Sequence, residues 1–271
     1  AKDSHLITYE ADVPYHFRYC VDELDSLKEY NLKKWYWDME WQQGGEHHDE
    51  ITTIVVYDNY DKKFYQWVWF PNNVECDTTF ENGVRFIFDN EKDMLELFVN
   101  TISVKDPDML IAWFGLKFDL PKLLERCQAL GVDARVISPI GEVKGFTSSK
   151  KSDTGFYFAY ADKGYSPIAQ PIGGRITLNL DLAFERQWND SQRGTLPSLS
   201  LEYISQTLFG EGKVSYGKFK DPNEFYRRGW LEDTNTYREY AVQDVELLRR
   251  IDETNFTSEA IIALQRLLIA P

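Results

Sequence analysis

A single aromatic segment, residues 35–41, constrains the fold of this chain more than any other stretch. Its sequence, Trp-Tyr-Trp-Asp-Met-Glu-Trp, is typical of a β-strand, because aromatic side chains fit a pleated surface. Side chains alternate between the two faces of a strand, so Asp38 and Glu40 share one face. Two neighbouring carboxylates repel each other unless a cation lies between them, and oxygen ligands favour Mg²⁺ or Mn²⁺. An exposed acidic pair on an edge strand is the alternative interpretation.

The hydrophobic pattern of the remaining chain predicts an α/β fold. We expect strands at residues 51–57, 63–70, 85–88, 109–114 and 175–182, and helices at 91–104, 120–130, 198–208, 234–254 and 258–269. The first two of these strands and the acidic strand would form an antiparallel meander. Residues 6–30 are expected to form short strands that include a hairpin, and residues 138–170, rich in Gly, Ser, Lys and Tyr, to be irregular.

Composition narrows the class of protein. The chain has 271 residues, of which 43% are hydrophobic, enough for a packed core. No apolar run approaches the ~20 residues that span a bilayer, and residues 1–5 lack the features of a signal peptide. We therefore expect an intracellular protein, cytoplasmic or nucleoid-associated, with no membrane contact. Cys20, Cys76 and Cys127 are too dispersed for a zinc site or a disulfide framework.

The net charge of −14 disfavours a polyanionic partner, but the charge is unevenly spread. Residues 144–228 contain 12 basic and 9 acidic residues, so this region is the one suited to phosphates. The candidate phosphate contacts are Lys144, Lys150, Lys151, Lys213, Lys218 and Lys220, and the candidates for base stacking are Phe114, Tyr157, Phe158 and Tyr160.

Further acids occur at two later positions. Asp119 follows the expected buried strand and occupies the expected N-cap of the next helix. Tyr240 and Asp244 are four residues apart in a long helix and so lie on one face. For this pair alone, an ordinary surface helix is the simpler interpretation, and the order of all these residues along the chain carries more weight than any pair.

This ordered set resembles the Exo I, Exo II and Exo III motifs of 3′→5′ exonucleases with a ribonuclease H-like fold and a tyrosine in the third motif. Asp38 and Glu40 match Exo I, Asp119 matches Exo II, and Tyr240 with Asp244 matches Exo III. The sister class has a histidine where this chain has Glu239, and no histidine follows His48.

Within that class the chain is similar to the proofreading domain of family B DNA polymerases. The supporting segments are Glu-Ala-Asp-Val-Pro at 10–14, Gly-Arg-Ile at 174–176, Asp-Leu at 181–182, Ser-Leu-Glu-Tyr-Ile at 200–204 and Leu-Phe-Gly-Glu-Gly-Lys at 208–213. The resemblance covers roughly residues 8–255. It implies a mixed five-stranded sheet flanked by helices and preceded by a short N-terminal β-hairpin region. The expected domains are an N-terminal β segment (1–30), an exonuclease domain (31–255) and a C-terminal helix (256–271).

The resemblance also implies an activity: removal of nucleotides from single-stranded or frayed DNA 3′ ends by two-metal-ion hydrolysis, as in replication proofreading. Asp38, Glu40, Asp119 and Asp244 would hold two Mg²⁺ or Mn²⁺ ions, and Tyr240 would complete the catalytic set. The expected nucleic-acid contacts are Phe114, Lys117, Phe118, Ser200, Leu201 and Lys213.

The chain departs from the family pattern in two respects. The asparagine that usually precedes Phe-Asp in Exo II is absent from residues 114–117, and Lys117 is a candidate replacement as a phosphate contact. No polymerase motif is present, so the expected partner is a polymerase domain of the same parent chain, or the protein is a relative that never had one. A stand-alone exoribonuclease and an inactivated nucleic-acid-binding module remain the alternatives.

Overall fold

The computed structural model describes residues 15–24, 26, 28–29, 31–71, 77–143, 146–147, 156–157, 168–169, 171–191 and 193–267. Contacts divide the chain into one unit of residues 32–255 and a second formed by residues 1–31 and 256–271. The larger unit contains the sheet, and the smaller contains helices α1 (Tyr15–Glu23) and α10 (Thr257–Leu267).

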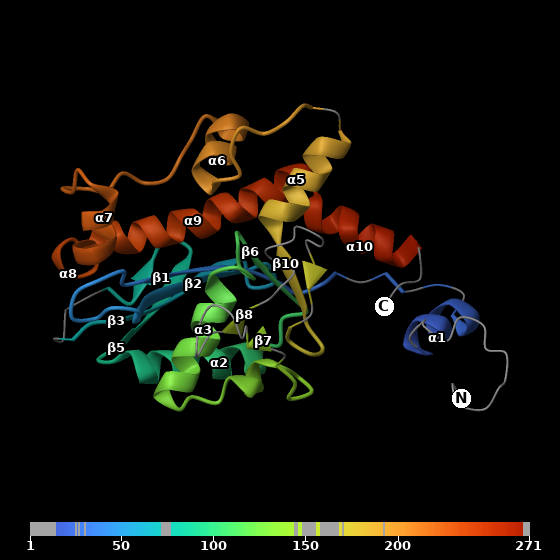
Figure 1. The fold of residues 1–271 in the computed structure, drawn as a ribbon, viewed down its shortest axis with the longest axis horizontal. Helices are drawn as coiled ribbons and strands as arrows, with labels where there is room; N and C mark the ends of the chain where they lie inside the picture. The colour runs from blue at the N-terminus through green and yellow to red at the C-terminus, as the bar shows by residue number, and fades with distance from the viewer. Residues whose placement is uncertain are drawn as a thin grey trace. The chain divides into compact units, whose positions relative to one another are not determined.

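A mixed sheet forms the centre of the larger unit (Figure 1). Its five central strands, in spatial order, are β3 (Lys63–Trp69), β2 (Ile51–Asp58), β1 (Lys34–Trp41), β6 (Met109–Ala112) and β10 (Ile176–Asn179). β2 is antiparallel to both β1 and β3, whereas β6 is parallel to β1 and to β10. This arrangement confirms the expected ribonuclease H-like α/β class.

The sheet has eight strands among the described residues, compared with the five expected. β5 (Gly83–Phe88) pairs in parallel with β3, and the two-residue strand β4 (Thr79–Phe80) pairs antiparallel with β5 at the edge of the sheet. β9 (Ile168–Ala169) pairs with β10 and extends the other edge. A separate pair is formed by β7 (Phe146–Thr147) and β8 (Phe156–Tyr157). The added strands leave the order of the central five unchanged.

Helices cover both faces of the sheet (Figure 1). On one side lie α2 (Glu91–Lys105) and α3 (Asp119–Leu130), followed by the short 3₁₀-helix η1 (Ala134–Ile137). On the other lie α5 (Leu180–Asp190), α6 (Leu201–Phe209), and the long α9 (Thr234–Asn255), preceded by α7 (Pro222–Glu224), the π-helix η2 (Phe225–Gly229) and α8 (Trp230–Glu232). None of the helices described has the length and apolarity needed to cross a membrane.

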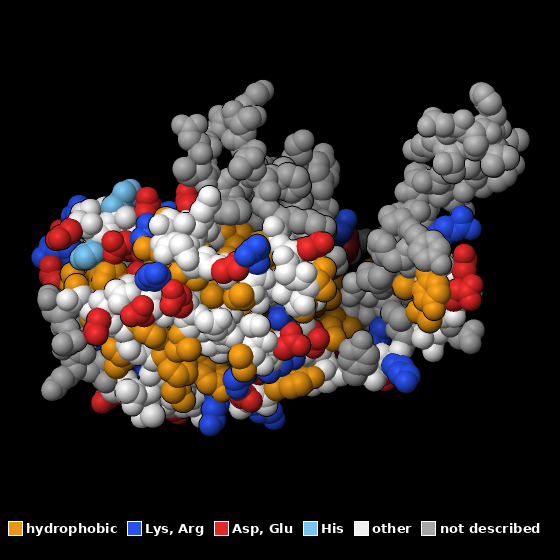
Figure 2. Space-filling view, turned by 90° about the horizontal axis from the view of Figure 1, so that it is seen from below, with side chains coloured by type: hydrophobic (Ala, Val, Ile, Leu, Met, Phe, Trp, Pro, Cys, Tyr) orange, Lys and Arg blue, Asp and Glu red, His pale blue; other side chains and the backbone are white. Residues whose placement is uncertain are grey.

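The alternation in β1 decides which face carries the core and which carries the site. Trp35, Trp37 and Met39 are buried, and Trp37 contacts Phe98 of α2 with ring centroids 6.3 Å apart. The opposite face of β1 turns toward α9. Seen from the side of α2 and α3, charged side chains of both signs are interspersed with apolar ones (Figure 2), so the described residues of that face form no broad basic surface.

Two sequence-based expectations about elements are wrong. Residues 15–23, expected within a β-hairpin region, form the helix α1; aromatic residues there have no strand described beside them, and strand propensity without a partner is weak. Residues 175–182, expected to be one strand, divide into β10 and the first turn of α5, with Asn179 at the junction. The remainder of the expected hairpin, before residue 15, lies outside the described residues.

Candidate active site

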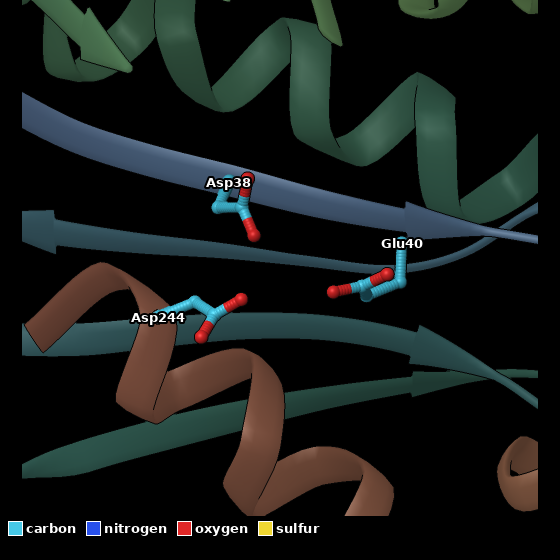
Figure 3. Close-up of side chains that lie close together, drawn as sticks. All are labelled: Asp38, Glu40 and Asp244. Atoms are coloured by element: carbon cyan, nitrogen blue, oxygen red, sulfur yellow. The ribbon is translucent and has the colours of Figure 1, made fainter. Parts of the chain in front are cut away.

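Strand β1 and helix α9 bring three acidic side chains to one point. The pairing of Asp38 with Val55 and of Glu40 with Thr53 fixes both β1 acids on the face toward α9. Asp244 projects from α9 toward them, and the three carboxylates point into a common space (Figure 3). One oxygen from each residue lies within 4.8 Å of the others.

The crowding of these carboxylates changes their acidity. Burial and the nearby Asp244 carboxylate raise the pKa of Asp38 to about 7. Burial, followed by repulsion from Asp38 and Asp244, raises the pKa of Glu40 well above its usual value. Burial also raises the pKa of Asp244, although Lys213 acts in the opposite direction. The site therefore needs more positive charge than the described residues around it supply.

Lys213 supplies part of that charge. Its ammonium donates to Asp244 Oδ2 at 2.5 Å and to the Tyr240 hydroxyl at 2.8 Å. Lys213 lies in the loop that follows α6, and its backbone N–H donates to Glu202 Oε2 of that helix at 2.6 Å. This hydrogen bond holds the loop in place. Burial opposes the charged lysine, but Asp244 and Glu40 outweigh it and raise its pKa, so Lys213 is a cation.

Tyr240 lies one turn of α9 before Asp244 and is fully buried. Its hydroxyl is 2.8 Å from the hydroxyl of Tyr226, which comes from the π-helix η2. Burial, then the charges of Asp244 and Glu40, raise the Tyr240 pKa, so the phenol stays protonated. A protonated phenol fixed at this position can orient a polar group but cannot act as a base.

A buried oxygen of Asp244 lacks a hydrogen-bond partner among the described residues. Asp244 Oδ1 is buried and makes no hydrogen bond to any described residue, whereas its other oxygen pairs with Lys213. A buried carboxylate oxygen is costly unless a donor or a cation satisfies it. Three carboxylates with one orphaned oxygen fit a divalent metal ion, and their oxygen-only chemistry fits Mg²⁺ or Mn²⁺.

Asp119 lies beside this cluster rather than within it. It lines the same 360 Å³ cavity as the three acids but is outside the group whose oxygens lie within 4.8 Å. Burial, and then the charges of Asp38 and Glu40, raise its pKa well above the usual value. Its expected N-cap position is wrong by one residue: Phe118 is the N-cap, and Asp119 is the first residue of α3.

The connection between β6 and α3 is held in an uncommon conformation. Phe114 has a φ of 58°, and its N–H donates to Asp181 Oδ1 at 3.3 Å. The Leu116 N–H donates to Asn179 Oδ1 at 2.8 Å. Gly115 permits this close approach, because a Cβ there would lie 2.5 Å from the Cβ of Ala112. The connection thereby places Phe114 and Phe118 at the cavity wall, with ring centroids 6.1 Å apart.

Ten of the eleven residues expected in the site line this cavity. They are Asp38, Glu40, Phe114, Phe118, Asp119, Ser200, Leu201, Lys213, Tyr240 and Asp244. Ser200 is the N-cap of α6, and its hydroxyl accepts from the Tyr203 N–H at 3.2 Å. Lys117 is not part of the lining; its ammonium lies 5.4 Å from the centroid of the Phe118 ring.

Other expected nucleic-acid contacts lie elsewhere. Lys218 contacts the Glu232 carbonyl oxygen at 3.0 Å and Lys220 is exposed, and neither lines the cavity. Lys144, Lys150, Lys151, Phe158 and Tyr160 lie outside the described residues, as does the side chain of Tyr157.

The sequence did not indicate several residues of the site. Tyr226, Trp113 and Gln43 line the cavity, and Asp181 anchors its wall. Tyr226 carries no spacing signal relative to Tyr240, because the two meet through the π-helix and not along one helix face. The Asp181 signal was available, since an acid directly after a buried strand is the feature that identified Asp119.

Comparisons with known proteins give a consistent result. A family model described as DNA polymerase family B, exonuclease domain, matches residues 38–166. A DNA polymerase of Thermococcus litoralis is 27% identical over 262 residues, covering 94% of this chain and 13% of that protein. A DNA polymerase of Pyrococcus glycovorans is 25% identical over 268 residues, covering 97% of this chain and 30% of the relative. The chain thus spans less than a third of the length of these relatives.

Proposed function

Because residues 38–166 match the family model of the DNA polymerase family B exonuclease domain, we propose that this chain removes nucleotides from the 3′ ends of single-stranded or frayed DNA. The observation that carries the proposal is the convergence of Asp38, Glu40 and Asp244, drawn from a strand and a distant helix. The reaction is hydrolysis of the terminal phosphodiester, in which water attacks phosphorus and the 3′ oxygen of the preceding nucleotide leaves.

The acids would hold two divalent ions. We assign Asp38, Glu40 and Asp244 to direct coordination, and Asp119, which lies beside them, to the surrounding water shell. The chemistry that Mg²⁺ or Mn²⁺ ions supply when bound is activation of the attacking water and stabilisation of charge on the phosphoryl and leaving oxygens. The raised pKa values of the carboxylates support this role, because they express a charge repulsion that cations relieve.

Tyr240 and Lys213 would act on the substrate side of the acids. The Tyr240 hydroxyl, positioned by Lys213 and Tyr226, is a donor that can orient the attacking water. Lys213, which is paired with Asp244, would place a positive charge next to the reacting phosphate and limit repulsion between that phosphate and the carboxylates. This role agrees with the phosphate contact that the sequence predicts for Lys213.

The cavity walls suit a single-stranded end. Phe114 and Phe118 offer aromatic rings on which bases can stack regardless of sequence. Ser200 and Leu201 lie at the N-terminus of α6, where backbone N–H groups favour a phosphate. We also propose that the chain is the proofreading region of a longer DNA-directed DNA polymerase, since its relatives extend far beyond the matched segment.

Digestion of a 5′-labelled oligonucleotide tests the proposal. With Mg²⁺, the wild-type chain should shorten single-stranded DNA stepwise from the 3′ end, and EDTA should stop it. Asp38→Ala should lower the rate of DNA shortening by several orders of magnitude, because it removes one of the three carboxylates assigned to bind the metal ions. The control is Asp89→Ala, which removes an exposed acid outside the cavity.

Three results would contradict the proposal: near-normal cleavage by Asp38→Ala, shortening from the 5′ end, or activity that persists in EDTA. A matched RNA oligonucleotide, digested faster than the DNA, would favour the exoribonuclease alternative. Circular dichroism of the Asp38→Ala variant shows whether its fold is retained.

A further inference from the structure

A second cavity lies on the other side of α9 from the acidic site. Its volume is about 690 Å³, compared with 360 Å³ for the cavity of the acids, and it lies between α9, β3 and the β4–β5 hairpin. None of the residues assigned to the exonuclease reaction lines it. Pockets of this size accommodate small organic ligands.

A buried arginine without an acidic partner lines this second cavity. Arg238 is only 7% exposed, and no carboxylate lies within ion-pair distance among the described residues. Its Nε donates to the Thr234 carbonyl oxygen at 3.0 Å, and one Nη contacts Asn235 Oδ1. The other, Nη1, is buried and has no hydrogen-bond partner in the described part of the chain. A buried cation left in this state is costly, and an anion would relieve the cost.

The surroundings of Arg238 keep it in place. Gln66 Nε2 donates to the Arg238 carbonyl oxygen at 3.2 Å, while Gln66 Oε1 accepts from Arg85 Nε at 2.7 Å. Arg85 is also buried and lines the cavity. At the rim, the exposed Lys62 adds a third positive charge with no ion pair among the described residues. Three cations therefore line one cavity, from β5, from α9 and from the turn before β3.

The floor of the second cavity is aromatic. The rings of Tyr57 and Phe64 lie 5.0 Å apart, and Phe80 follows Phe64 at 6.5 Å. Arg249 covers Tyr57 at 4.8 Å from the ring centroid but is paired with Glu246 and Glu253, so it forms part of the wall. A ligand with both an anionic group and a flat apolar part matches this combination.

We propose that this second cavity binds a nucleoside monophosphate, with its phosphate near Arg238 and Lys62 and its base along Tyr57, Phe64 and Phe80. The site is separate from the exonuclease reaction but next to it. Val214 lines the second cavity, and its neighbour Lys213 lines the first. A nucleotide bound here would thus lie against the segment that carries the lysine of the acidic site.

Calorimetric titration with dTMP in EDTA tests this binding. Without divalent ions the clustered carboxylates of the exonuclease site repel a phosphate, so binding in EDTA reports on the second cavity. We expect a single site, with inorganic phosphate binding more weakly than dTMP. Failure of dTMP to bind at millimolar concentration would overturn the proposal, and equal binding of phosphate would overturn the placement of the base.

Three substitutions locate the bound nucleotide. Lys62→Asn should weaken dTMP binding by roughly three- to tenfold, and asparagine tolerates the positive φ of 53° at this position. Lys63→Asn is the matched control, because it removes a neighbouring charge that lies outside the cavity. Glu239→Gln removes an acid from the rim and should strengthen binding a few-fold.

Equal weakening by Lys62→Asn and Lys63→Asn would reveal a general charge effect and overturn the site. Arg238→Gln should abolish binding, and the two exposed positions keep the proposal testable if this buried variant does not fold. The exonuclease rate of Lys62→Asn should equal that of the wild type. A loss of dTMP binding with normal exonuclease activity therefore separates this inference from the proposed function.

Discussion

Lys213 determines how the acidic site balances its charge. Its ammonium contacts Asp244 and the Tyr240 hydroxyl, yet the pKa values of Asp38 and Glu40 are still raised. One lysine is therefore insufficient for three carboxylates. Negative charge that Lys213 does not neutralise remains on the other carboxylate oxygens, including Asp244 Oδ1, which has no hydrogen-bond partner among the described residues.

The Tyr240 hydroxyl should contribute to the rate and not to folding. In Tyr240→Phe the buried ring remains, but the donor held by Lys213 and Tyr226 is lost. We expect the rate of DNA shortening to fall about 10²-fold, the usual cost of removing one oriented donor, with little change in KM. Single-turnover digestion of a labelled oligonucleotide measures the effect.

Tyr216→Phe is the control for that variant. The Tyr216 ring lies 6.0 Å from that of Tyr240, but no hydrogen bond of its hydroxyl to a described residue is present. Its rate should stay within about twofold of the wild type, as expected for a substitution that removes no oriented donor. A Tyr240→Phe variant as active as Tyr216→Phe would show that the hydroxyl has no part in the reaction.

At the level of elements, strong periodicity made the sheet and the long helices predictable. The expected helix at 91–104 is α2 (Glu91–Lys105), which Asn90 caps, and the expected helix at 234–254 is α9 (Thr234–Asn255). The helix α5 escaped prediction because it follows β10 with no intervening loop, and its N-cap Asn179 makes no capping hydrogen bond. That asparagine instead holds the connection after β6.

The site was predictable to the extent that its residues follow one another in regular elements. Alternation in β1 placed Asp38 and Glu40 together, and helical spacing placed Tyr240 above Asp244. Contacts between separate loops and helices left no such trace, so the pairing of Lys213 with Asp244 and the contact of Tyr226 with Tyr240 required the structure.

The connection between β6 and α3 should depend on Asn179. Asn179→Ala leaves the buried Leu116 N–H without its acceptor, which typically costs roughly 1–3 kcal/mol. We expect a lower urea midpoint and also a slower exonuclease, because the connection positions Phe114, Phe118 and Asp119. Ser191→Ala, which removes an exposed hydrogen bond to Gln187 at the end of α5, should change stability by less than about 0.5 kcal/mol.

The urea midpoint and the rate of DNA digestion should therefore both fall in Asn179→Ala. Neither quantity should change in Ser191→Ala. Wild-type stability of Asn179→Ala would mean that the Leu116 N–H finds another acceptor. A destabilised variant with an unchanged rate would mean that the connection does not position the acidic site.

Over the whole molecule, the acidic cluster links folding to pH. A carboxylate whose pKa is raised in the folded state binds protons more tightly there than in the unfolded chain. Its contribution to stability is fully present below the unfolded pKa, near ~4, and is lost as the pH rises through the folded pKa, which for Asp38 is about 7. Glu40, Asp119 and Asp244 shift in the same direction. With a net charge of −14, the rest of the chain does not offset this repulsion.

Divalent metal should therefore stabilise the folded chain more at high pH than at low pH. At pH 5 the carboxylates hold protons that a metal ion must displace, whereas at pH 8 they are ionised and repel one another. We expect Mn²⁺ in place of EDTA to raise the Tm clearly at pH 8 and only slightly at pH 5, in differential scanning fluorimetry of the same preparation. The variant with Asp38→Asn, Glu40→Gln and Asp244→Asn should show no such increase at either pH, because the amides cannot ionise. An equal increase at both pH values, or one that persists in the triple variant, would place the bound metal away from these three residues.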